Sequence, residues 1–358
     1  MSIGIDSNEI KITKFSNDYF EVVSNNWQKL EKKICNDNMF LSWDWMQNVL
    51  SQNIEKSYVV ELFQNLELVA ICIIGVSDGL IRRGYLNKTG NSDIDQVWIE
   101  HNDILASKNT LAEFRHLIID HILNSPLLNI QSLDLDMTAS GLTEGLKEKQ
   151  MINTAQSPGF IKELDSIICK ESLLNTLSKN SRSQLKRSIK NLEKNGSLNV
   201  EFLSNEQQKQ HALDEIAKRH KVQWRQSEWG SGFDNPCFCD FHHQLIKSKN
   251  TLISCLKQNG NVLAYGYYFV LNTRVSFYLS AIQKHQDNNI KVGLIFHSLT
   301  MLKFANLGIT KYDFLAGDAR YKRSLSDQEY SLQSSRLYKK NLLGSVEYLL
   351  RKLKRKFI

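Results

Sequence analysis

The sequence has little proline or glycine and no long hydrophobic run. Its 358 residues include 3 prolines and 17 glycines, which argues against a low-complexity chain or long disordered linkers. The longest apolar run, Val69 to Val76, is far too short to cross a bilayer. The first residues lack the basic start and apolar run of a signal peptide, so we expect a cytoplasmic protein.

Several signatures of common enzyme and metal-site classes are also missing. The sequence contains no Walker P-loop, no G-x-G-x-x-G and no Gly-x-Ser-x-Gly, which disfavours nucleotide folds of those types and a serine hydrolase. The six cysteines are scattered, and Cys72 and Cys255 lie in apolar strand-like runs, as buried free thiols do in a reducing compartment. The segment from Cys237 to His243 matches no strong ligand spacing, so we expect no metal.

The composition is that of a globular protein with a basic bias. A hydrophobic fraction of 42% is ample for a packed core, and the length favours two domains. The net charge of +7 suits an anionic ligand such as a nucleotide, coenzyme A, tRNA or an anionic membrane face. Many soluble enzymes carry as much charge and bind no polyanion, so the net charge alone favours none of these ligands.

The two halves of the chain repeat one order of predicted elements: helices, antiparallel strands, a helix and a strand. In the first half these are helices at 20–34 and from Ser42, strands at 58–63 and 68–74, a strand within 95–106, a helix at 111–123 and a strand at 130–135. In the second half they are a basic helix or helix pair at 171–195, a strand at 198–203, a helix at 206–224, strands at 251–256, 262–270 and 274–282, a helix at 294–305 and a strand at 311–315. Two copies of one α/β unit explain this order.

We predict domains over 1–160 and 161–335, with a boundary near Ser157 to Gly159, and a basic amphipathic helix over 336–358.

Candidate functional residues follow the strands of the second half. The strand at 274–282 leads through a loop with Lys291 and Gly293 into a helix, whose N-terminal N–H groups could hold a pyrophosphate. Asp318, Tyr321 and Lys322 follow the next strand, where a carboxylate can take a proton from an amine and a phenol can protonate a thiolate. An ordinary strand-to-helix loop and a capped surface turn are the alternative explanations.

Three further segments have two readings each. His220 and Trp224 share a helix face, either as a substrate wall with a base or as a packed aromatic edge. The basic helix around Arg182 either holds phosphates or is a solvated helix face. The apolar stripe and terminal cations of 336–358 either pack against the protein, the commoner arrangement, or lie on an anionic membrane.

The second half resembles the acetyltransferases of the cellulose-biosynthesis (CelD/BcsL-like) family, which belong to the GNAT superfamily and are close to the FemAB peptidyltransferases. The resemblance spans roughly 165–325 and rests on the order of loose motifs. These are Leu177-Ser-Lys-Asn-Ser-Arg182-Ser-Gln-Leu-Lys-Arg187, Glu193-Lys-Asn-Gly196, His220 with Trp224, Ala264-Tyr-Gly266, Gly293, Asp313-Phe-Leu-Ala-Gly317-Asp318 and Tyr321-Lys322. The first half looks like a degenerate copy. One departure is that the usual GNAT pyrophosphate loop is not intact, with Val292 where the family has proline.

The resemblance implies an α/β (α+β) chain with a tandem GNAT-like fold, an acyl-CoA N-acyltransferase fold of mixed sheets flanked by helices. It also implies direct transfer of an acyl group, expected to be acetyl, from acyl-CoA to an amine. It assigns catalytic roles to Asp318, His220 and Tyr321, cofactor binding to Ser280, Ile282, Lys291, Val292 and Gly293, and substrate binding to Arg182, Trp224 and Lys322. The donor thioester would lie between the splayed strands 274–282 and 311–315.

The function expected from this resemblance is N-acylation of a sugar amine or another cell-envelope or polysaccharide precursor. The partners would be acetyl-CoA or another acyl-CoA, a small-molecule or saccharide amine, and the inner face of the membrane through 336–358. One alternative is a FemAB-like aminoacyl transferase that uses charged tRNA, the one reading with a nucleic-acid partner. Another is a non-catalytic polysaccharide-assembly protein at the membrane.

Overall fold

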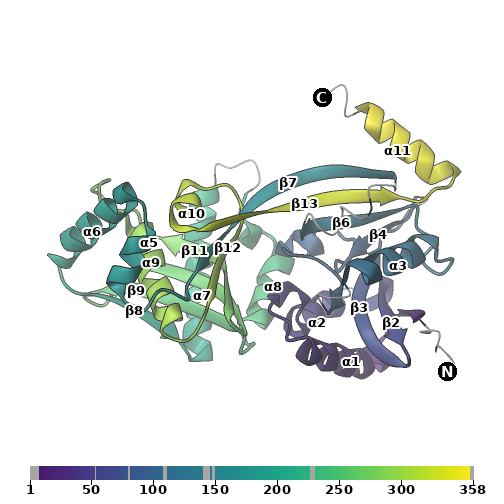
Figure 1. Cartoon of the computed structure of the whole chain (residues 1–358), viewed down its shortest axis with the longest axis horizontal. Coiled ribbons are helices and arrows are strands. Elements are labelled where there is room, and N and C mark those ends of the chain that lie inside the picture. Colours follow the sequence, from purple (N-terminus) through teal and green to yellow (C-terminus); the bar gives the residue numbers. More distant parts are fainter. Residues whose placement is uncertain are drawn as a thin grey trace, which may run out of the picture. The chain divides into compact units, whose positions relative to one another are not determined.

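The computed structural model describes residues 8–52, 54–79, 81–107, 111–139, 146, 150–225 and 230–354. The chain divides into two compact units, one of Met1–Ser157 with Ser331–Ile358 and one of Pro158–Tyr330. Two long strands, β7 (Gln150–Glu163) and β13 (Gln328–Tyr338), each pass from one unit into the other (Figure 1). The assignment of functional domains to 1–160, 161–335 and 336–358 stays a prediction.

The first unit is a mixed sheet flanked by helices. Its elements are β1 (Asn8–Lys14), η1 (Asn17–Tyr19), α1 (Phe20–Lys33), η2 (Met39–Leu41), α2 (Trp43–Gln52), η3 (Ile54–Lys56), β2 (Ser57–Gln64), β3 (Glu67–Val76), β4 (Arg83–Leu86), η4 (Ile94–Val97), β5 (Leu105–Ala106), α3 (Leu111–Asn124), β6 (Ser132–Ala139) and α11 (Leu342–Lys354). The strand order is β1-β2-β3-β4-β6-β13, with β5 on β3. All these pairs are antiparallel except β4 with β6, whose connection includes α3.

The second unit repeats this arrangement. Its further elements are α5 (Lys170–Thr176), α6 (Lys179–Glu193), β8 (Leu198–Leu203), α7 (Glu206–Trp224), η5 (Gly232–Asp234), α8 (Pro236–Leu245), β9 (Thr251–Gln258), β10 (Asn261–Leu271), β11 (Arg274–Ile282), α9 (Val292–Ala305), β12 (Lys311–Ala316) and α10 (Arg320–Leu325). The strand order is β7-β12-β11-β10-β9-β8. These described strands pair antiparallel except β11 with β12, which are parallel and connected through α9. The predicted tandem GNAT-like fold is confirmed, because each unit holds a run of antiparallel strands followed by a parallel pair with a crossover helix.

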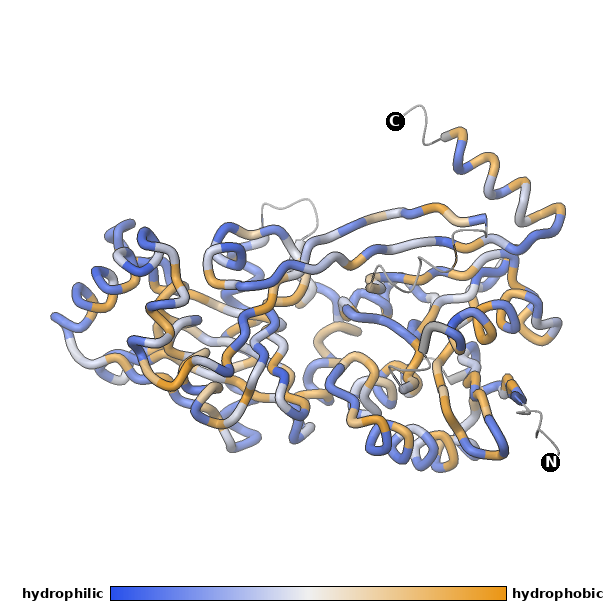
Figure 2. The backbone as a smooth tube through the Cα atoms, in the orientation of Figure 1, coloured by the Kyte–Doolittle hydropathy of each residue, from blue (hydrophilic) through white to orange (hydrophobic). Residues whose placement is uncertain are grey.

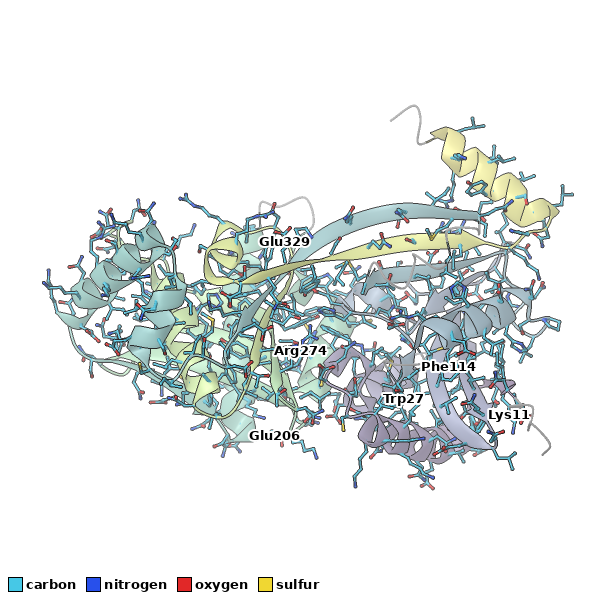
Figure 3. All side chains as sticks on the ribbon, viewed as in Figure 1. Lys11, Trp27, Phe114, Glu206, Arg274 and Glu329 are labelled. Carbon is cyan, nitrogen blue, oxygen red and sulfur yellow. The ribbon has the colours of Figure 1, made fainter. Side chains whose placement is uncertain are left out.

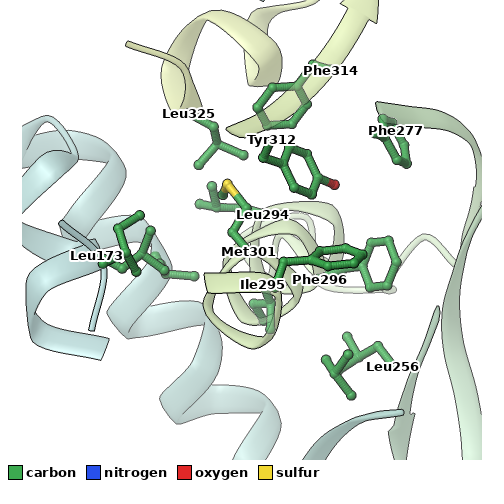
Figure 4. Close-up of a cluster of buried hydrophobic side chains, with 14 of the residues drawn as sticks. Leu173, Leu256, Phe277, Leu294, Ile295, Phe296, Met301, Tyr312, Phe314 and Leu325 are labelled. Atoms are coloured by element: carbon green, nitrogen blue, oxygen red, sulfur yellow. The ribbon is translucent and has the colours of Figure 1, made fainter. Parts of the chain in front are cut away.

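The core of the second unit gathers around α9. This helix is apolar on nearly all sides, and Ile295, Phe296 and Met301 are fully buried. Figure 4 shows side chains from β11, β12, α5 and α10 surrounding it. A helix that is hydrophobic all round belongs inside a protein, so its packing fixes the strands on either side of it.

Most predicted helices and strands have the expected bounds. The predicted helix from Ser42 is α2, and Ser42 caps it by accepting from the Trp45 N–H at 3.3 Å. The basic segment at 171–195 is a pair of helices, because the chain is extended at Leu177 before Ser178 caps α6. Within 95–106, only Leu105–Ala106 form a strand.

The long strands were not predicted. The expected boundary at Ser157 to Gly159 lies inside β7, and the predicted C-terminal helix begins at Leu342, because residues up to Tyr338 belong to β13. A side chain at Gly159 would meet the Tyr330 ring of β13 at 2.1 Å, so this glycine admits the aromatic ring. Both strands are rich in polar residues, and only their pairing in the folded chain defines them.

Candidate active site

The strands β11 and β12 part at the centre of the second unit. They are paired at Arg274 with Lys311, Val275 with Tyr312 and Ser276 with Asp313, and their pairing ends there. Yet β11 continues to Ile282 and β12 to Ala316. The ladder between β11 and β12 thus ends at Ser276 and Asp313, and the two strands diverge beyond these residues.

A β-bulge lies at the same place. Across β10, Tyr267 pairs with Leu279 and Tyr268 with Phe277, so Tyr278 is the extra residue of β11. Before the bulge, Phe277 belongs to the core around α9, and after it Ile282 approaches Gly293 of α9. The bulge therefore changes the side chains of β11 that face α9 from odd-numbered to even-numbered residues. A bulged strand also bends at the bulge.

The two faces of this sheet carry different groups. Tyr268 and Phe277 contact each other on the face covered by α9. Tyr267 and Tyr278 lie on the other face, where the His242 ring of α8 contacts both. The opening between β11 and β12 thus lies between an α9 face and an α7–α8 face.

On the α9 face, His297 and Tyr321 form a stacked pair. Their ring centroids are 5.1 Å apart and the planes differ by 11°. The His297 ring also contacts Phe277 of β11 at 4.7 Å and Phe314 of β12 at 5.3 Å, so it lies between the parting strands. Burial raises the pKa of Tyr321, which keeps its phenol protonated at neutral pH.

His297 was not singled out from the sequence. It is 1% exposed, and its Nδ1 lies 3.0 Å from the Tyr312 hydroxyl. Its Nε2 has no hydrogen-bond partner among the described residues. Burial lowers the pKa of His297 to about 3, so the imidazole is neutral. The one signal in the sequence was a histidine within a largely apolar helix.

On the opposite face, His220 of α7 is held by polar and aromatic neighbours. It is 7% exposed, its Nδ1 lies 2.8 Å from the Ser231 hydroxyl, and its ring stacks on Trp224. Phe233 packs edge-on against the same ring. Burial lowers the pKa of His220 to about 4, which leaves a neutral imidazole that can accept a proton. The sequence-predicted pair of His220 and Trp224 is in contact.

The loop after β12 holds the other predicted residues in different surroundings. Asp318 is exposed and forms an ion pair with Arg323 at 2.8 Å, which lowers the pKa of its carboxyl. Lys322 is buried, and its ammonium donates to the carbonyls of Leu315 at 3.2 Å and Ala316 at 2.6 Å. Lys322 thus stabilises the end of β12, and its role in substrate binding stays a prediction.

The predicted donor residues lie together at the end of β11 and the start of α9. The helix begins at Val292 with no side-chain N-cap on Lys291, and Lys291 itself is exposed. Ser280 and Ile282 end β11, and a side chain at Gly293 would meet Ile282 Cδ1 at 3.3 Å. The first turn of α9 therefore offers backbone N–H groups and a positive dipole end.

Arg182 has a structural contact at the start of α6. Its Nη2 donates to the carbonyls of Leu177 at 3.2 Å and Asn175 at 3.4 Å, which end α5. These bonds satisfy carbonyls at a helix C-terminus and hold α5 against α6. Its role in binding substrate stays a prediction.

The family comparison matches the part of the chain that carries this geometry. Residues 179–323 match the family model of the acetyltransferase (GNAT) domain. The protein is an acyltransferase. The GNAT match covers both faces of the opening, from α6 through β11, α9 and β12 to α10. No curated protein sequence matches the chain significantly.

Solved structures resemble the whole chain at low identity. The structure of FemX is 10% identical, with a TM-score of 0.63 over 95% of this chain and 99% of that chain. The C-terminal domain of a putative lysylphosphatidylglycerol synthetase from Agrobacterium fabrum is 9% identical, with a TM-score of 0.57 over 93% and 95%. A tandem GNAT protein from the clavulanic acid biosynthesis pathway is 9% identical, with a TM-score of 0.50 over 93% and 100%. These likenesses support the tandem GNAT fold.

Among the described residues, no helix is both long and apolar enough to cross a bilayer. No three His, Cys, Asp or Glu side chains of that part of the chain gather as a metal site.

Proposed function

We propose that this acyltransferase moves an acyl group, in the first instance acetyl, from acyl-CoA to an amino group by direct attack. The observation that carries the proposal is the parting of β11 and β12 beyond Ser276. The protonated phenol of Tyr321 stacks on His297 of α9, and the neutral imidazole of His220 lies on α7, the helix that packs against β11 from the other side. A thioester can enter from one face and an amine from the other. The uncapped start of α9, on the phenol face, is suited to the pyrophosphate of coenzyme A.

The reaction needs one proton removed and one supplied. The amine nitrogen attacks the thioester carbonyl carbon, and backbone N–H groups of β11 beyond Ser276 stabilise the developing oxyanion. The amine attacks in its neutral form, and its nitrogen becomes positively charged as the new bond forms. His220 takes the proton that this nitrogen then loses, directly or through water. The carbon–sulfur bond then breaks, and Tyr321 protonates the thiolate that leaves. We assign the base to His220 rather than Asp318, because the Asp318 carboxylate is exposed and already paired with Arg323, whereas the His220 imidazole is buried on the helix that packs against β11.

For the acceptor, we propose an amine on a sugar or on another cell-envelope or polysaccharide precursor. The support is the resemblance of the motifs between Arg182 and Lys322 to the cellulose-biosynthesis acetyltransferases. We place the reaction in the cytoplasm.

The test is a thermal-shift screen with acetyl-CoA and longer acyl-CoAs. A ligand at a hundred times its dissociation constant stabilises the folded protein by about 2.7 kcal/mol. We expect a clear rise in Tm with at least one acyl-CoA and release of free thiol when an amine acceptor is added. Absence of any shift with every acyl-CoA would overturn the donor assignment.

A specific observation favours one alternative, aminoacyl transfer from charged tRNA. A shallow groove of about 570 Å³ lies between α5 and α6, and four lysines line it: Lys170, Lys186, Lys190 and Lys194. Glu171 and Glu193 also line the groove, which reduces its positive charge. If charged tRNA is the donor, treatment with ribonuclease abolishes activity. The double variant Lys186→Gln with Lys190→Gln then binds tRNA more weakly, and its affinity for tRNA depends less on salt concentration. Activity with acyl-CoA that resists ribonuclease contradicts this alternative.

A further inference from the structure

The C-terminal helix α11 contacts the rest of its unit through its polar side. Glu347 is 9% exposed and accepts hydrogen bonds from Arg83 at 2.8 Å and Arg351 at 3.2 Å. Ser345 contacts Gln150 at 3.2 Å. A side chain at Gly344 would meet the Lys339 carbonyl at 2.3 Å, so the backbone packs closely there. The residues that hold α11 in place are therefore Gly344, Glu347 and their neighbours.

The apolar side of α11 is exposed. Six large aliphatic side chains form it, with exposed fractions of 80% for Leu342, 57% for Leu343, 46% for Val346, 55% for Leu349, 62% for Leu350 and 54% for Leu353. At about 100° per residue these six lie within an arc of about 120°, roughly opposite Gly344. Figure 2 shows the hydrophobic and hydrophilic stretches that alternate along this helix. The usual orientation of an amphipathic helix, with its apolar face inward, is reversed here.

The charge around this face is strongly positive. From Lys339 to Lys356 the sequence holds seven lysines and arginines and one acidic residue. That acidic residue, Glu347, is buried and paired with Arg83. A surface of exposed leucines edged by cations is complementary to anionic lipid headgroups above an acyl layer. A second copy of α11 would bring the same positive charge and repel it.

We infer that α11 lies in the interface of an anionic bilayer, with its six aliphatic side chains in the headgroup and acyl boundary. The helix has 13 residues, whereas a spanning helix needs about 20, so it lies along the surface. Its attachment through Glu347 and Gly344 would hold the rest of the unit at the membrane. This inference does not depend on the proposed acyl transfer.

The test is flotation of the full-length protein with vesicles of phosphatidylcholine containing 30% phosphatidylglycerol, compared with pure phosphatidylcholine. We expect binding to the anionic vesicles that weakens with added salt. Leu349→Gln with Leu353→Gln should weaken it roughly tenfold or more. Lys339→Gln, Lys340→Gln and Lys352→Gln should each weaken it roughly fivefold.

The matched control is the double variant Leu66→Gln with Leu307→Gln. These two leucines are 90% and 64% exposed but do not lie on α11, so this variant should bind the anionic vesicles as the wild type does. The inference is overturned if wild type does not float, or if the control loses binding as the α11 variant does. It is equally overturned if light scattering finds a dimer that Leu349→Gln with Leu353→Gln dissociates while vesicle binding is absent. A fall in Tm of that variant without lipid would mean that the face is covered within the protein, which also overturns it.

Discussion

The imidazole ring of His297 lies parallel to the phenol ring of Tyr321, with centroids 5.1 Å apart and 11° between the planes. His297 is itself fixed by the Tyr312 hydroxyl at 3.0 Å and by Phe277 and Phe314 on the two parting strands. Tyr321 is 36% exposed, so its ring has one packed face and an accessible portion. This stack orients the phenol at the opening where the proposed leaving thiolate is released.

The first prediction concerns the proton donor. Tyr321→Phe keeps the stack on His297 and removes the hydroxyl, so kcat should fall about 100-fold while KM for acyl-CoA changes little. Steady-state release of free thiol measures both. Tyr348→Phe, in the other unit, is the control and should keep wild-type rates. An unchanged kcat for Tyr321→Phe would remove Tyr321 from the mechanism.

The second prediction separates the stack from the rest of the His297 side chain. His297→Phe retains a flat ring against Tyr321, whereas His297→Ala removes it. Both lose the hydrogen bond to Tyr312, which costs about 1 kcal/mol of unfolding free energy. We expect kcat to fall roughly tenfold or more in His297→Ala and to be largely kept in His297→Phe, with KM similar in both. Equal losses of kcat in the two variants would show that the imidazole acts in another way.

The third prediction identifies the base. His220→Gln should lower kcat/KM about 100-fold, and Asp318→Asn by less than about threefold, since Asp318 is exposed and paired with Arg323. Because burial lowers the pKa of His220 to about 4, its imidazole is mostly neutral above pH 5. Protonation of His220 should therefore cause no fall in kcat/KM at any pH above 5. A larger loss in Asp318→Asn than in His220→Gln would reverse the assignment.

The fourth prediction concerns stability and pH. Burial lowers the pKa of His220 to about 4 and of His297 to about 3, while both titrate near 6.5 in the unfolded chain. Between pH 7 and pH 5 the unfolded state binds protons that the folded state does not, so the unfolding free energy falls by about 2 kcal/mol for each histidine. Urea unfolding at the two pH values measures this fall.

In His297→Phe, the fall in unfolding free energy between pH 7 and pH 5 should be smaller than in the wild type by the contribution of one histidine. His211→Gln, on an exposed position of α7, is the matched control and should leave it unchanged. The prediction fails if the wild type and His297→Phe lose the same unfolding free energy between pH 7 and pH 5.

The fifth prediction concerns the donor end of the site. Gly293→Val places a branched side chain on the first turn of α9, where even a Cβ would meet Ile282 Cδ1 at 3.3 Å. Acyl-CoA should then bind roughly tenfold more weakly, seen as a higher KM with kcat retained. Gly293→Ala should fall between wild type and Gly293→Val. An unaltered KM in Gly293→Val would place the donor elsewhere.

Local sequence signals predicted the elements that carry them. The Asn-Gly turn at Asn259 and Gly260 and the alternating strands around it predicted β9 to β11, and Ser42 predicted the start of α2. The resemblance pointed to His220, Trp224 and Tyr321 as functional residues, and the structure puts the first two in contact and the third beside the opening. Their catalytic roles stay predictions.

The sequence by itself determined the duplicated order of elements and the region of the site, because hydrophobic periodicity and turn residues act over a few positions. Only the tertiary structure decided that Lys322 binds carbonyls of β12, that His297 supports Tyr321, and that the leucines of α11 face outward. It also decided where β11 and β12 part, since a bulge at Tyr278 depends on pairing with a neighbouring strand. These contacts join residues far apart in the chain, and their geometry follows from packing that no local pattern encodes.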